Sequence, residues 1–96
     1  MKASELKDQI KAGNKVLVLD VREKDEYDAG EKIEGSENMP MGRVFAEASK
    51  GNLSKDAKIV TVCKSGVRCE IVARELKQKG YNIDHLEGGI EAWKND

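Results

Sequence analysis

Short apolar runs that alternate with helical segments constrain the fold of this chain more than any other feature. Residues 16–19 form an unbroken apolar run closed by Asp20, and residues 59–62 repeat the strand pattern ahead of Cys63. Such runs are typical of strands that are buried on both faces, as the strands of parallel sheets are. Because parallel neighbours need crossover connections, we expect helices between these strands.

The segments around these runs carry helical spacing. Leu6 and Ile10 share one face of a first helix, which we expect Ser4 to cap and Gly13 to end. The clearest helix follows the second strand, where small and apolar residues recur at helical spacing over residues 69–76. The sequence also predicts shorter elements, in chain order a helix over residues 23–29, a strand end at 38–40, a helix from Pro40 to about Gly51, a strand at 83–86 and a last helix after Gly88 and Gly89.

Alternating strands and helices predict an α/β fold with a small, mainly parallel sheet flanked by helices. A chain of 96 residues has room for one core, so we expect a single domain over residues 1–96. In such a sheet, ligands bind outside the carboxyl ends of the strands. The residues at those ends are Asp20, Cys63 and the run 87–89, and Cys63 is the one soft nucleophile among them.

Charge and composition exclude several classes of function. Lys and Arg number 17 and Asp and Glu number 18, so the net charge is −1 and electrostatic binding of nucleic acid is disfavoured. No stretch approaches the roughly 18 apolar residues that span a bilayer, and residues 1–13 read as an amphipathic helix, so we expect no membrane association and a cytoplasmic location. Two cysteines without a secretory signal are expected to be reduced thiols.

The candidate chemistry lies in the segment CKSGVR, residues 63–68, between a strand and the start of a helix. Backbone N–H groups at a helix amino terminus lack helical partners and can converge on an anion. The helix dipole, Lys64 and Arg68 would favour the thiolate of Cys63, which predicts a nucleophile there. The alternative is a small buried hydrophobic residue at a strand end. The predicted substrate-binding residues are Lys64, Ser65, Gly66, Val67 and Arg68.

Three further strings stand in order around the cysteine loop. They are LDVREKDEY at residues 19–27, IEGSENMP at 33–40 and LEGGIEAW at 86–93. Together with the loop they resemble the rhodanese, or sulfurtransferase, domains in their single-domain form, over nearly the whole chain. The resemblance implies that Cys63 takes a sulfane sulfur from a small anionic donor such as thiosulfate, holds it as a persulfide, and yields it to cyanide or a thiol without a cofactor. Loop amides and the helix dipole would stabilise the anionic terminal sulfur.

Two other functions are compatible with the same loop. A carrier or interaction module would hold persulfide sulfur for a dedicated partner protein and turn over small donors poorly. Cysteine-dependent phosphatases and arsenate reductases resemble the fold but use a loop one residue longer than the four residues between Cys63 and Arg68, so sulfur transfer is preferred. No metal site is expected, because two cysteines with five residues between them and one distant histidine match no usual zinc spacing.

Asp20 and Arg22 match the DVR positions of the family, where the resemblance implies a supporting role around the loop. A carboxylate at this sheet edge could pair with Arg68 or accept loop N–H groups. For Arg68, tying the loop to a carboxylate and contacting the substrate are both open. The family's usual Gly-His-Ile is replaced by GEKI at residues 30–33, which adds one residue and removes the histidine.

Cys69 stands just after the arginine, where the family often has serine. Its helical spacing with the apolar residues that follow favours a small buried core residue. The alternative hypothesis is that Cys69 resolves the Cys63 persulfide as a disulfide. The one histidine, His85, falls within the last predicted strand, and we expect a surface or packed side chain there.

Overall fold

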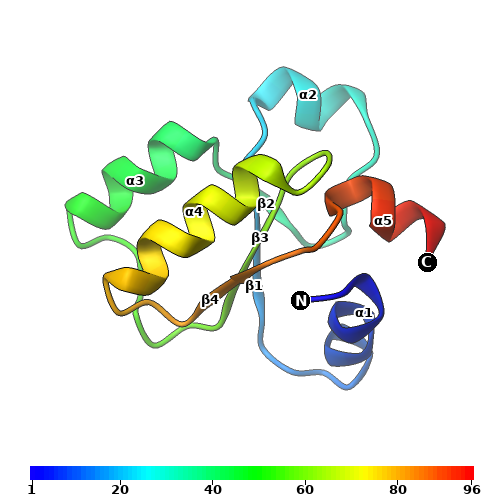
Figure 1. Cartoon of the computed structure of the whole chain (residues 1–96), viewed down its shortest axis with the longest axis horizontal. Coiled ribbons are helices and arrows are strands. Elements are labelled where there is room, and N and C mark those ends of the chain that lie inside the picture. Colours follow the sequence, from blue (N-terminus) through cyan, green and yellow to red (C-terminus); the bar gives the residue numbers. More distant parts are fainter.

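A computed structural model describes residues 1–96, and strands alternate with helices along the chain as predicted. Four strands form one parallel sheet in the order β2-β1-β3-β4 (Figure 1). The predicted α/β class with a small parallel sheet flanked by helices is therefore confirmed. The elements are α1 (Ala3–Lys11), β1 (Leu17–Asp20), α2 (Lys24–Ala29), β2 (Glu37–Asn38), α3 (Met41–Ser49), β3 (Ile59–Val62), α4 (Val67–Gln78), β4 (Ile83–His85) and α5 (Gly89–Asn95).

Helices cover both faces of the sheet. Figure 1 shows α3 beside α4 on one side of the strands and α1 near α5 on the other. Successive strand residues point to opposite faces, so Leu19 and Ile59 join the core under α3 and α4. Val18, Val60 and Val62 join the core under α1 and α5. Burial on both faces explains why the central strands are mostly apolar in sequence, with Asp20 and Thr61 as their polar residues.

The first helix begins earlier than its sequence suggests. It starts at Ala3 with Lys2 at the cap position, so the prediction that Ser4 caps it is wrong. The Glu5 carboxylate accepts the Lys2 backbone N–H at 3.4 Å, and an acidic side chain in the first turn is also favoured by the helix dipole. Gly13 follows the helix with φ +80°, in the left-handed conformation predicted for its end.

The two central strands end side by side. Asp20 of β1 is the register partner of Val62 of β3, so Cys63 emerges next to the end of β1. The buried Thr61 hydroxyl donates to the Cys69 carbonyl at 2.8 Å, which fastens the first turn of α4 to β3. The loop after β3 and the start of α4 therefore lie next to the end of β1, at the carboxyl edge of the sheet.

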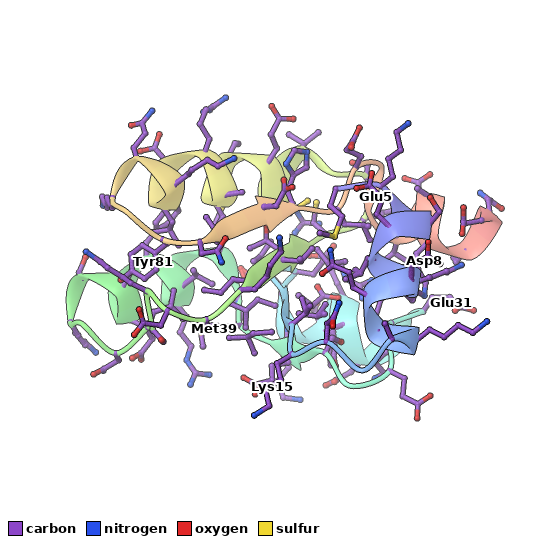
Figure 2. All side chains as sticks on the ribbon, turned by 90° about the horizontal axis from the view of Figure 1, so that it is seen from below. Glu5, Asp8, Lys15, Glu31, Met39 and Tyr81 are labelled. Atoms are coloured by element: carbon purple, nitrogen blue, oxygen red, sulfur yellow. The ribbon has the colours of Figure 1, made fainter.

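Three further features of the structure concern other parts of the chain. The Tyr81 hydroxyl lies 3.5 Å from the Ala48 carbonyl on α3, and Figure 2 shows Tyr81 at the end of the molecule opposite Glu5 of α1. His85 in β4 is half-buried, with 24% of its side chain exposed, which lies within the expected range from a surface to a packed side chain. No helix has both the length and the apolar character that crossing a bilayer requires.

Candidate active site

Cys63 lies immediately after β3 at the carboxyl edge of the sheet. Its side chain is only 1% exposed. The residues after it form an irregular loop that leads into α4, in which Gly66 is buried while Lys64, Ser65 and Val67 are exposed. The predicted loop therefore encloses a buried sulfur and presents its side chains to solvent.

The Cys63 sulfur is surrounded by hydrogen-bond donors. The backbone N–H groups of Gly66 and Cys69 point at Sγ from 3.1 and 3.4 Å. Gly66 reaches this position with φ +103°, which a residue with a Cβ atom adopts only under strain. Contact with the Cys69 thiol and the loop N–H groups lowers the pKa of Cys63 from its ordinary value near 9 to about 5, against the opposing effect of burial. This environment therefore favours the thiolate of Cys63 over the thiol.

The amino terminus of α5 orients the loop from behind. The Ile90 N–H donates to the Cys63 carbonyl at 2.8 Å, and the Glu91 N–H donates to the Lys64 carbonyl at 3.2 Å. A Cβ atom at Gly89 would lie 2.3 Å from the Cys63 carbonyl oxygen and 2.6 Å from that of Lys64. Because these carbonyls face α5, the N–H groups farther along the loop are free to face the sulfur.

This contribution of α5 was not predicted. The sequence places Gly88 and Gly89 at the carboxyl edge, after the last strand, but indicates no contact with the cysteine loop. The two backbones pass so closely that a Cβ atom at Gly66 would lie 3.1 Å from the Gly88 nitrogen. Consecutive glycines at such an edge were the available signal, since close approach of two backbones requires residues without side chains.

Arg68 ties the loop to α2. Its Nη1 and Nη2 atoms donate to the two carboxylate oxygens of Glu26 at 2.7 and 2.9 Å, and each side chain is about one third exposed, 34% and 37%. The expectation that Asp20 could pair with Arg68 or accept loop N–H groups is wrong, because the Asp20 side chain is bound to Arg22. Of the two possibilities for Arg68, the ion pair with Glu26 supports the structural one.

Asp20 and Arg22 form a buried pair at the end of β1. Arg22 donates to the Asp20 carboxylate through Nε at 2.9 Å, through Nη2 at 2.7 Å and through its backbone N–H at 3.1 Å. Arg22 Nη2 also donates to the Glu31 carbonyl at 2.8 Å, and the Asn38 amide donates to the Arg22 carbonyl at 2.9 Å. These bonds connect the end of β1 to the segment that leads into β2. Removing either partner of the buried pair would leave the other charge uncompensated, so we expect the pair to hold this segment in one arrangement.

A hollow of about 330 Å³ opens beside the loop, between α2 and α5. Gly30 and Glu31, from the segment that departs from the family pattern, form part of its wall. The charged side chains that line it are Arg22, Lys64, Lys94, Glu26, Glu31 and Glu91. The segment that departs from the family pattern thus borders the space next to the loop, and side chains of both charges line that space. No three His, Cys, Asp or Glu side chains are placed to hold a metal ion.

We predict that Glu26→Gln lowers the free energy of unfolding by about 0.5–1 kcal/mol at neutral pH, as is usual for a partly exposed ion pair. Arg68 lowers the pKa of Glu26 from 4.5 to about 2. The ion pair therefore stabilises the folded protein fully above pH 4.5, and this stabilisation is lost as the pH falls through about 2. The stability difference between the two proteins should therefore shrink over this window in thermal unfolding. Glu34→Gln, an exposed carboxylate outside the ion pairs, is the control. An equal difference at pH 2 and pH 7 would contradict the prediction.

Comparison with known proteins identifies the family of the chain. A model of the rhodanese-like domain matches residues 2–96. YtwF of Bacillus subtilis (strain 168), which carries a sulfurtransferase name, is 32% identical over 91 residues, covering 95% of this chain and 85% of YtwF. YrkF of the same organism, which carries a sulfur carrier name, is 31% identical, covering 91% of this chain and 46% of YrkF. The chain spans about a quarter or less of the length of several other curated relatives that it matches.

The fold is shared with a solved structure as well. The crystal structure of a rhodanese-related protein from Thermoplasma volcanium superposes with a TM-score of 0.84 at 35% identity, covering 99% of this chain and 89% of that one. The family match over residues 2–96 and this superposition each cover nearly the full chain. On these grounds the chain belongs to the rhodanese-like domain family.

Proposed function

We propose that this protein transfers sulfane sulfur from a small anionic donor such as thiosulfate to cyanide or a thiol, through a persulfide on Cys63. The observation that carries the proposal is the geometry at Cys63, a buried cysteine at the start of a loop whose backbone N–H groups point at its sulfur. Membership of the rhodanese-like family supports sulfurtransferase chemistry in general.

In the first step, the Cys63 thiolate attacks the outer sulfur of thiosulfate. An S–S bond forms to Cys63, the S–S bond of thiosulfate breaks, and sulfite leaves with the electron pair. The persulfide carries its negative charge on the terminal sulfur, where loop N–H groups and the start of α4 stabilise an anion. In the second step, cyanide or a thiolate attacks that terminal sulfur, and the Cys63 thiolate leaves.

The loop residues divide by position in this proposal. Lys64 is exposed at the rim of the hollow beside the loop and is free to attract an anionic donor. Ser65, Gly66 and Val67 supply the backbone around the sulfur, and Arg68 holds the loop to Glu26. Because Cys63 is nearly covered, the exposed part of the loop must move for the donor sulfur to reach Sγ.

A second candidate is a sulfur carrier that serves a partner protein. The match to YrkF, a relative with a sulfur carrier name, favours this candidate. Both functions use a Cys63 persulfide. They differ in turnover, since a carrier would accept sulfur from its partner but process thiosulfate and cyanide slowly.

Mass spectrometry of the intact protein after incubation with thiosulfate tests the shared step. A gain of about 32 Da on Cys63, one sulfur atom, is expected, and reaction with cyanide should remove it. Steady-state formation of thiocyanate would then separate the enzyme from the carrier. A protein that gains no sulfur from thiosulfate or from a persulfide donor would contradict both candidates.

The pH dependence of sulfur loading gives a further prediction. Because the pKa of Cys63 is lowered to about 5, the thiolate fraction is already near its maximum at neutral pH. The loading rate should therefore rise as the pH increases through about 5 and stay level up to neutral pH, in rapid-quench mass spectrometry with circular dichroism as a control for folding. A rise centred near 9, the ordinary value for a thiol, would show that the loop does not stabilise the thiolate.

A further inference from the structure

A second thiol touches the proposed nucleophile. The sulfur of Cys69, in the first turn of α4, lies 3.3 Å from the sulfur of Cys63, and neither cysteine forms a disulfide. Cys69 is fully buried and belongs to the core under α3 and α4, as its helical spacing predicted. Core packing alone does not explain the contact between the two sulfurs, because any small apolar side chain would fill the same space.

The surroundings of the two sulfurs show which one holds the proton. Cys63 Sγ faces the N–H groups of Gly66 and Cys69, which are donors and therefore favour a thiolate. Cys69 Sγ faces the carbonyl oxygens of Gly66 at 3.3 Å and Leu86 at 3.8 Å, which are acceptors and therefore favour a thiol. The contact with Cys63 and burial also raise the pKa of Cys69. The shared proton thus resides on Cys69.

We propose that the Cys69 S–H group donates a hydrogen bond to the Cys63 thiolate and, by stabilising that thiolate as a leaving group, promotes discharge of the persulfide. The first part rests on the geometry of the two sulfurs. The second part rests on the proposed persulfide chemistry. The proposal assigns Cys69 a positioning function in addition to its place in the core.

The effect on discharge follows from where the negative charge lies in each state. In the persulfide the charge is on the terminal sulfur, so the inner sulfur is a weak acceptor and the Cys69 S–H group can turn to the Gly66 carbonyl. When an acceptor attacks the terminal sulfur, the S–S bond breaks and its electron pair returns to Cys63 Sγ. The Cys69 proton then meets a full negative charge at 3.3 Å, and hydrogen bonds to charged groups are the stronger ones.

The same contact argues against Cys69 as a resolving thiol. Resolution would require the Cys69 sulfur to attack the inner sulfur of the persulfide, forming a disulfide and releasing hydrosulfide. The attacking species in such reactions is the thiolate, but two carbonyl oxygens and a neighbouring negative charge keep Cys69 protonated. The structure therefore favours a donor over a nucleophile at this position.

Two variants test the hydrogen bond. Cys69→Ala removes the donor with little loss of volume, whereas Cys69→Ser keeps a donor of similar size. The Cys63 thiolate is titrated by its ultraviolet absorbance, with Cys63→Ala as the blank and thermal unfolding as the control for folding. Cys69→Ala should raise the midpoint of the Cys63 titration by about one pH unit. Cys69→Ser should return the midpoint most of the way to that of the unsubstituted protein. An unchanged midpoint in a folded Cys69→Ala protein would overturn the proposal.

The two half-reactions test the consequence for sulfur transfer. Cys69→Ala should load sulfur from thiosulfate no more slowly than the unsubstituted protein but discharge it to cyanide about threefold more slowly, since lower-pKa thiols leave faster. Cys69→Ser should discharge at a rate close to the original. Equal discharge rates in all three proteins, or a disulfide with a mass about 2 Da below the reduced protein after thiosulfate treatment, would contradict the proposal. The titration needs no sulfur donor, so it decides the hydrogen bond even if the protein proves not to transfer sulfur.

Discussion

Cys63→Ser is expected to abolish sulfur transfer, lowering the rate by about a thousandfold or more. A serine hydroxyl remains protonated at neutral pH and forms no persulfide, although it fits the same space at the end of β3. The substituted protein should therefore fold, gain no mass with thiosulfate and form no thiocyanate. The Cys63 sulfur accepts hydrogen bonds from two backbone N–H groups, and a serine hydroxyl oxygen can accept them as well. The free energy of unfolding should therefore change little.

The matched control for this substitution is Cys69→Ser. It leaves Cys63 as the only thiol, so it should still gain one sulfur atom, and iodoacetamide should then label a single site. Persisting transfer in the Cys63→Ser protein would show that another group carries the sulfur. Failure of Cys63 to react with iodoacetamide at any pH would show that the loop never opens, and phosphatase activity on para-nitrophenyl phosphate that depends on Cys63 would favour the phosphatase function instead.

Gly89→Ala is expected to lower the free energy of unfolding by about 3 kcal/mol or more, because a left-handed residue with a Cβ atom is strained and the site offers no space. Gly89 has φ +60°, and its Cβ atom would lie 2.3 Å from the Cys63 carbonyl oxygen, well inside van der Waals contact. Any relief would have to move the loop away from α5. Protein that still folds should then transfer sulfur about a hundredfold more slowly, because the donors around the sulfur are displaced.

Gly35→Ala is the matched control for the glycine substitution. Gly35 also has a left-handed backbone, with φ +85°, but nothing lies within 4 Å of its Cβ position. It should therefore lose only about 1–2 kcal/mol, the ordinary cost of the conformation, with no change in sulfur transfer. Equal losses of stability for Gly35→Ala and Gly89→Ala in chemical denaturation would show that the space between α5 and the loop can hold a Cβ atom at Gly89.

The order and type of the elements could be predicted because they depend on local patterns. Buried strands and amphipathic helices differ in the period of their apolar residues, and the predicted bounds at residues 16–19 and 83–86 differ from β1 and β4 by only about one residue. The position of Cys63 at the carboxyl edge follows from the same reasoning, since it stands directly after the second run. The cap of α1 could not be placed in this way, because several residues near Ser4 can begin a helix.

The partner of Arg68 illustrates what local patterns leave open. Asp20 lies at the same sheet edge, but its carboxylate is bound by Arg22, two residues farther along the chain. Glu26, 42 residues before Arg68, binds the guanidinium because the fold brings α2 next to the start of α4. Many carboxylates in this charged chain could have served, and only the place of α2 in the fold selects one of them.

The sequence by itself determined the alternation of strands and helices and the position of Cys63, the proposed nucleophile, at the carboxyl edge of the sheet, because each depends on residues close together in the chain. Only the tertiary structure decided that α5 orients the loop and that Cys69 faces the Cys63 sulfur from a pocket of carbonyl oxygens. The physical reason is that a hydrogen bond depends on the direction of backbone groups from separate elements. That direction is set when β3, α4 and α5 pack together.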